Sequence, residues 1–243
     1  MLLALLLGVA ADLSPGRLVL VGLAVLAGQL SVGWSNDLID LPRDCAVGRQ
    51  DKPIPAGEIS ERTVRLACAT AVVAVFPLSL ACGLVAGVVH LVCVASAWSY
   101  NLGLKSTVWS WLPYAVSFSA LTVFVSLAGG DVPPWWWPTA GALLGVGAHL
   151  VNVLPDLADD AATGVHGLPH RLGARRLPVV ATAVLAAGSL VVVLGSGLTR
   201  ISVLALAVVA TLAVVALTGR GRAPFLAAVA IALVDVVLLV VAD

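Results

Sequence analysis

The sequence predicts an all-α, polytopic membrane protein with about nine transmembrane helices. Of its 243 residues, 60% are hydrophobic and only 11% are charged, and the mean hydropathy is +1.08. Soluble globular domains are much more polar than this. No polar stretch is long enough for a separate soluble domain, so we expect residues 1–243 to form one membrane domain.

The apolar runs predict the helices in order. A membrane-spanning helix needs about 20 apolar residues, so the first run, Met1–Ala11, is short, and Ser14, Pro15 and Gly16 form a turn after it. Pro42 removes a backbone hydrogen bond, so the helix that begins near Arg17 should kink or end there. The predicted longer spans are Arg17–Trp34, Val64–Leu80, Cys82–Ser99, Ser110–Ala128, Pro138–Leu154, Leu177–Gly195, Ile201–Leu217 and Pro224–Ala242.

The positive charges predict the orientation in the membrane. With these spans, all 13 Lys and Arg residues except Arg17 and Arg200 fall on one side, which the positive-inside rule makes cytoplasmic. Trp135, Trp136 and Trp137 then fall on the outer side, where we expect them to lie at the membrane interface. The preference for Arg over Lys suggests a GC-rich bacterial genome, and hence a bacterial cell membrane.

Two short segments at helix ends hold six of the 13 acidic residues. The first contains Asn36, Asp37, Asp40 and Asp44, and the second runs from Pro155 to Asp160. The spacing of Asn36, Asp40 and Asp44 places them on one face of a helix, unless Pro42 turns the last of them away. The second segment repeats this spacing. Charge this concentrated at the ends of membrane helices requires a cation to balance it.

Carboxylate and amide oxygens suit a hard cation. Mg²⁺ commonly takes a few protein oxygens and leaves positions for substrate phosphates, so the implied ligand is a diphosphate bridged by Mg²⁺. Arg49 and Lys52, in the polar loop after the first segment, are available to the diphosphate oxygens. The alternative for the acidic segments is that their side chains are simply solvated in loops. The alternative for Arg49 and Lys52 is that they are ordinary positive charges at the membrane edge.

These segments resemble the signatures of the UbiA superfamily of intramembrane prenyltransferases, N-D-x-x-D-x-x-x-D followed later by D-x-x-x-D. The flanks are similar as well, in the loop Arg49–Gly57 (RQDKPIPAG) and the tail Leu168–Gly173 (LPHRLG). Tyr100 and Lys105 match a Tyr and a Lys that the superfamily often carries between the fourth and fifth spans. The alternative for this pair is an interfacial Tyr beside a snorkelling Lys.

The resemblance implies a bundle around a central cavity and a role for each matching residue. The implied metal ligands are Asn36, Asp40, Asp44, Asp156, Asp159 and Asp160. The implied catalytic residues are Asp37, Asp40, Asp156, Asp160, Tyr100 and Lys105. The implied diphosphate-binding residues are Arg49, Lys52, Lys105, Asn152 and Arg171. His149 shares a helix face with Asp156 and is expected to line the cavity below the metals.

The expected activity is transfer of a prenyl group from an isoprenyl diphosphate to an aromatic or other lipophilic acceptor, with Mg²⁺ as cofactor and membrane lipid as surroundings. A terpene cyclase on the same scaffold, which needs no acceptor, is the main alternative. A transporter or scaffold with a cation site is a third, but no charged path crosses the spans. No basic patch suggests a nucleic-acid partner.

Overall fold

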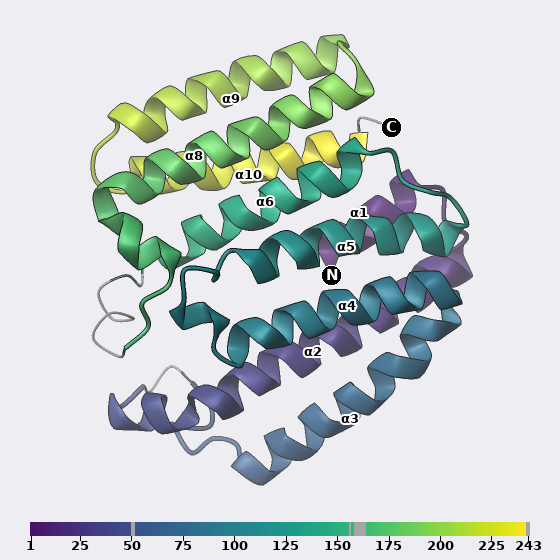
Figure 1. Cartoon of the computed structure of the whole chain (residues 1–243), viewed down its shortest axis with the longest axis vertical. Coiled ribbons are helices and arrows are strands. Elements are labelled where there is room, and N and C mark those ends of the chain that lie inside the picture. Colours follow the sequence, from purple (N-terminus) through teal and green to yellow (C-terminus); the bar gives the residue numbers. More distant parts are fainter. Residues whose placement is uncertain (50–51, 156, 158–163, 242–243) are drawn as a thin grey trace.

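The computed structural model describes residues 1–49, 52–155, 157 and 164–241. Within these ranges it is all-helical, which confirms the predicted fold class (Figure 1). The α-helices are α1 Leu2–Ala10, α2 Pro15–Ala46, α3 Glu61–Ala81, α4 Leu84–Asn101, α5 Leu112–Gly129, α6 Trp136–Val153, α8 Leu168–Ser196, α9 Arg200–Thr218 and α10 Ala223–Val241, and a 3₁₀ turn spans Leu104–Ser106.

Seven helices are long and apolar enough to cross a membrane within the part of the chain that the structure describes: α2, α3, α4, α5, α8, α9 and α10. α6 has 18 residues but carries two tryptophans, His149 and Asn152, which lower its hydropathy. α1 has only nine residues. The chain is therefore an integral, multi-pass membrane protein, and its helix positions agree closely with the predicted spans.

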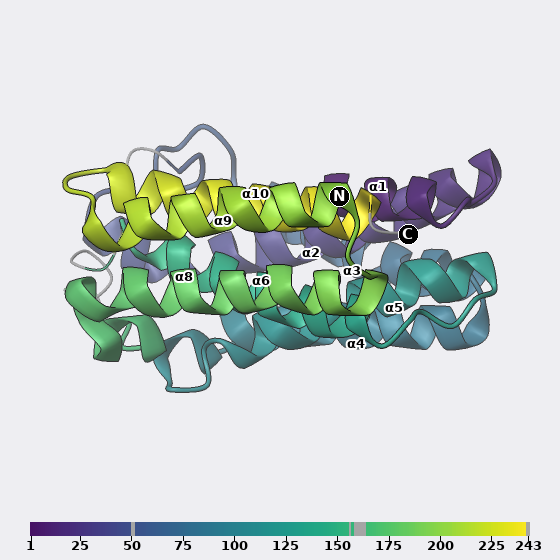
Figure 2. The same ribbon diagram turned by 90° about the horizontal axis from the view of Figure 1, so that it is seen from above.

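Neighbouring helices in sequence pack beside one another, from α2 with α3 to α9 with α10. Figure 2 shows two layers, with α9, α10 and α1 in one and α8, α6 and α5 in the other. α1 contacts α2, α5 and α10, and its Leu7 is fully buried in a cluster with Val21, Phe124 and Leu239. α1 therefore fills one end of the bundle, opposite the acidic end of α2.

Two helix ends differ from the predictions. α2 does not end at Pro42 but continues to Ala46, so Asp40 and Asp44 remain one helical turn apart. α8 begins at Leu168, before the predicted Leu177, and Gly173 breaks its helical geometry with φ 73° and ψ 163°. Only glycine adopts this backbone conformation readily, which explains a bend at this position.

The tryptophan prediction was wrong for two of three residues. Trp135 is 62% exposed, but Trp136 and Trp137 are 4% and 2% exposed. Trp136 packs against Gly195 of α8, where even a methyl group would overlap its ring. Trp136 and Trp137 therefore belong to the helix packing and not to an interfacial belt.

Candidate active site

The first acidic segment lies on the last turns of α2. Asn36 and Asp37 line a cavity, whereas Asp40 and Asp44 are buried, with 6% and 1% exposure. Because α2 continues through Pro42, all four side chains come from consecutive turns of one helix. The three carboxylates of the first segment therefore lie close together at the C-terminal end of α2.

Within the part of the chain that the structure describes, three cations pair with these carboxylates. Lys52 Nζ lies 2.8 Å from Asp44 Oδ2 and 3.2 Å from Asp37 Oδ1. Lys105 Nζ donates a hydrogen bond to Asp40 Oδ1, and Arg43 lies 3.2 Å from Asp40 and 3.7 Å from Asp44. Three carboxylates thus face three positive side chains, and the formal charges of these six described residues balance.

Lys52 lies outside the helices, in the loop after α2. Burial of its ammonium group acts to lower the pKa, but Asp44 and Asp37 outweigh burial and raise the pKa of Lys52 above its usual value. The ammonium therefore stays protonated at neutral pH and holds the loop against the end of α2.

The carboxylates of α2 suit a divalent cation chemically. Asp44 Oδ2 is buried and lies 2.8 Å from the Lys52 ammonium, so the structure already places positive charge at this oxygen. Among the described residues, no group of three or more His, Cys, Asp or Glu side chains is arranged to hold a metal. The remaining predicted ligands, Asp156, Asp159 and Asp160, lie outside the described residues.

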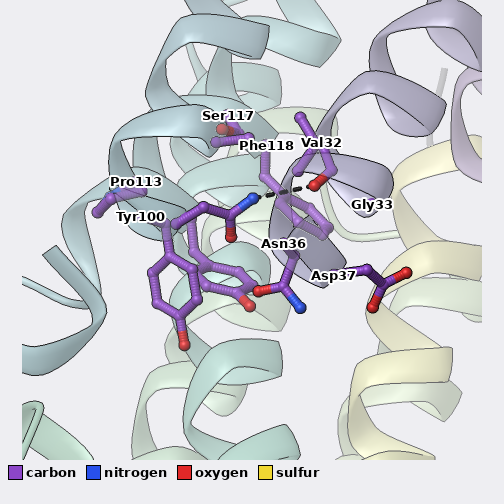
Figure 3. Close-up of a pocket in the computed structure, with 11 residues that line it drawn as sticks. Val32, Gly33, Asn36, Asp37, Tyr100, Pro113, Ser117 and Phe118 are labelled. Atoms are coloured by element: carbon purple, nitrogen blue, oxygen red, sulfur yellow. Dashed lines mark hydrogen bonds between the residues drawn. The ribbon is translucent and has the colours of Figure 1, made fainter. Parts of the chain in front are cut away.

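A cavity of about 510 Å³ opens beside the acidic segment (Figure 3). Its lining comes from α2, α4 and α5: Val32, Gly33, Asn36, Asp37, Ala97, Tyr100, Asn101, Pro113, Tyr114, Ser117 and Phe118. Figure 3 shows the polar atoms of Asn36 and Tyr100 on one side of the pocket and Ser117 on the other. The end at the carboxylates is therefore polar, whereas Val32, Ala97 and Phe118 make the deeper end more apolar despite Ser117.

Aromatic rings make up much of the cavity wall. The rings of Tyr100 and Tyr114 meet edge to face at 5.2 Å, and Phe118 lies one helical turn beyond Tyr114. Sequence reasoning missed Tyr114 and Phe118 as site residues. Their i, i+4 spacing places both side chains on one face of α5. This spacing alone predicts a site only weakly, because the sequence does not show which face of α5 points inward.

Buried hydrogen bonds fix the position of α4 against α2. The Asn101 amide donates to the Val32 carbonyl oxygen (dashed in Figure 3) and to Ser35 Oγ, each at 2.9 Å. Asn101 is only 4% exposed. Tyr100, its neighbour in sequence, is thereby held beside Asn36 and Asp37.

Lys105 reaches the cluster from the 3₁₀ turn Leu104–Ser106. Its loop is tied to the start of α8, because Ser110 Oγ accepts a hydrogen bond from the Leu168 backbone N–H and lies 3.1 Å from His149 Nε2. Gly167 also packs directly against the Lys105 carbonyl oxygen. The Lys105 loop and the segment after the second acidic motif therefore form one unit.

His149 was expected to line the cavity, but the structure places it behind the cavity wall. It is 1% exposed and stacks on Tyr114 with ring centroids 4.5 Å apart. The residues Arg49, Asn152 and Arg171 are exposed and do not belong to the described lining. Their predicted contacts with diphosphate stay predictions.

The fold and the site define a class: a helical membrane protein with a charge-paired acidic cluster at the mouth of an aromatic-lined cavity. The sequence matches the UbiA prenyltransferase family over residues 1–224. The chain belongs to this family, as its motifs indicated.

Two curated relatives are similar to the chain. It is 33% identical over 193 residues to the bacteriochlorophyll synthase 33 kDa chain of Cereibacter sphaeroides, covering 72% of this chain and 62% of the relative. It is 33% identical over 159 residues to a digeranylgeranylglyceryl phosphate synthase of Methanothrix thermoacetophila, covering 62% and 57%. The chain thus spans less than two thirds of the length of these relatives.

Solved structures share the fold. The apo UbiA homolog from Aeropyrum pernix K1 has a TM-score of 0.77 at 19% identity, with 98% of this chain and 94% of that chain covered. The Archaeoglobus fulgidus homolog bound to GPP and Mg²⁺ has a TM-score of 0.73 at 17% identity, with 99% and 95% covered. At these identities the similarity establishes the helical architecture.

Proposed function

We propose that the protein is a Mg²⁺-dependent intramembrane prenyltransferase. In this proposal it moves a prenyl group from an allylic isoprenyl diphosphate to an aromatic or other lipophilic acceptor and releases diphosphate. The observation that carries the proposal is the cluster of Asp37, Asp40 and Asp44, paired with lysines, at the mouth of an aromatic-lined cavity. The names of both curated relatives describe synthases, and the A. fulgidus structure holds GPP and Mg²⁺.

The α2 residues Asn36, Asp40 and Asp44 would hold Mg²⁺, together with Asp156, Asp159 and Asp160 from the second segment. Mg²⁺ bound there would supply positive charge that stabilises the departing diphosphate. Lys52 and Lys105, which neutralise the carboxylates here, would turn toward the diphosphate oxygens. Arg49, Asn152 and Arg171 are further diphosphate ligands in this proposal.

The cavity wall would contact the prenyl chain of the substrate. Faces of Tyr100, Tyr114 and Phe118 can stabilise positive charge on the allylic carbon through cation–π attraction. The mostly apolar wall would limit access of the water that could otherwise capture the carbocation. The acceptor then takes the prenyl group, and Asp156 or Asp160 would receive its proton. The aromatic wall equally suits a cyclase, in which the substrate's own double bonds capture the cation.

The site would open toward the cytoplasm of a bacterium, because the positive side chains gather at the acidic end of the bundle. This orientation brings water-soluble diphosphate and metal from the cytoplasm and the lipophilic acceptor from the membrane.

The test uses purified protein in detergent with geranyl, farnesyl and geranylgeranyl diphosphates, with and without Mg²⁺. Mg²⁺-dependent diphosphate release that requires an added phenolic or quinone-precursor acceptor is the expected result. Release without acceptor, together with a cyclic hydrocarbon, would replace the transferase by the cyclase. No release under either condition would contradict the proposal.

A further inference from the structure

One glycine of α2, Gly33, lines the deeper part of the cavity. The lining residues fall into two levels, because one helical turn advances about 5.4 Å. The polar level holds Asn36, Asp37, Tyr100, Asn101, Pro113 and Tyr114. The deeper level lies one turn away on each of the three helices and holds Val32, Gly33, Ala97, Ser117 and Phe118.

The deeper level is open because two of its residues are small. Gly33 and Ala97 face the cavity from α2 and α4. A Cβ atom added at Gly33 would meet no other heavy atom within 4 Å. Two other glycines inside α2 differ, since a Cβ at Gly28 would lie 2.8 Å from Val94 and one at Gly22 would lie 3.2 Å from Leu5. Close helix packing therefore explains Gly28 and Gly22 but not Gly33.

A missing side chain inside a helix has a cost. Glycine in a helix interior is less favourable than alanine by about 1 kcal/mol, and Gly33 lies in the middle of α2, where no positive φ requires it. Neither helix packing nor backbone geometry therefore explains why residue 33 is a glycine. The structural effect that remains is the space that the missing side chain leaves in the cavity.

We propose that Gly33 determines which prenyl chains the site accepts. This inference rests on the proposed function. A diphosphate held near Asn36 and Asp37 would direct its prenyl chain away from the charges, past the level one turn deeper. The first isoprene units would then lie between Gly33 on one side and Phe118 on the other. A larger side chain at residue 33 occupies this passage and excludes the chain without touching the diphosphate.

The test measures binding of a series of ligands in the presence of Mg²⁺. The ligands are inorganic pyrophosphate and the unreactive thiolodiphosphates of dimethylallyl, geranyl and geranylgeranyl alcohols, and the proteins are the wild type, Gly33→Ala and Gly33→Leu. Affinity for pyrophosphate should be unchanged in all three. Affinity for the geranyl and geranylgeranyl ligands, relative to pyrophosphate, should fall about tenfold or more in Gly33→Leu and less in Gly33→Ala.

Gly16→Leu is the matched control. Gly16 is also on α2 and also has open space around it, but it lies at the start of the helix, away from the cavity. This variant should bind every ligand as the wild type does. If Gly33→Leu binds prenyl ligands and pyrophosphate in the wild-type ratio, the role of Gly33 is refuted. If the wild type binds none of these ligands, it is the proposed function that fails.

Discussion

Replacing Lys52 by Met tests whether the chain's own cation occupies the place of a metal. Its ammonium lies 2.8 Å from the buried Asp44 carboxylate. At an effective dielectric constant of about 20, the attraction between two charges at this distance is about 6 kcal/mol, and desolvation offsets part of it. Removing one partner of a buried ion pair costs about 3–5 kcal/mol. Because the Lys52 side chain is 19% exposed and Arg43 remains nearby, we expect Lys52→Met to lower the free energy of unfolding by about 3 kcal/mol.

The assay is thermal unfolding of purified protein in detergent, with EDTA and with Mg²⁺. In EDTA, Lys52→Met should unfold about 6–12 °C below the wild type, since 1 kcal/mol corresponds to about 2–4 °C for a domain of this size. Mg²⁺ should stabilise this variant more than the wild type, because the metal no longer has to displace an ammonium group from Asp44 and Asp37.

Arg65→Met is the control for loss of one positive charge. Arg65 pairs with Glu61 at the surface, with side chains 70% and 47% exposed, and exposed ion pairs contribute little. This variant should unfold at nearly the wild-type temperature and respond to Mg²⁺ in the same way. The reasoning is refuted if Lys52→Met is as stable as the wild type in EDTA, or if Mg²⁺ stabilises both proteins equally.

Three further substitutions test the site. Asp40→Ala removes the partner of Lys105 and Arg43 and should abolish diphosphate release while membrane insertion stays normal; full activity would remove Asp40 from the site. Lys105→Ala should raise the KM for prenyl diphosphate, and an unchanged KM would return Lys105 to a snorkelling role. Asn101→Leu leaves the Val32 carbonyl oxygen without its side-chain donor and should lower stability by about 1–3 kcal/mol, seen as a lower unfolding temperature; an unchanged temperature would show that this hydrogen bond does not hold α4 against α2.

Much of the fold was predictable because the membrane imposes simple rules on the sequence. Apolar runs of near-constant length predict the helices, and most observed bounds lie within a few residues of those expected. The helical period also predicted that the α2 acids would gather on one side. The motif singled out Lys105 as a site residue, and the structure places it beside Asp40; its contact with diphosphate stays a prediction.

Other features depend on tertiary contacts that no local pattern contains. Pro42 loses one backbone hydrogen bond, but ion pairs on both sides of it, at Asp40 and Asp44, hold the end of α2 in place. Arg43 was missed as a site residue for the same reason, because what places it in the site is its contacts with Asp40 and Asp44. The inward rotation of α5, which brings Tyr114 and Phe118 to the cavity, follows from packing against α4 and α6.

The central proposal is that the α2 carboxylates would hold a divalent metal next to the diphosphate of the substrate. The most direct measurement is phosphorus-31 electron–nuclear double resonance of Mn²⁺ bound to the protein together with geranyl thiolodiphosphate. The account predicts strong phosphorus coupling to the metal in the wild type, and loss of bound Mn²⁺ in a variant with both Asp40→Ala and Asp44→Ala. Mn²⁺ that binds without phosphorus coupling, or that binds this variant equally well, would contradict it.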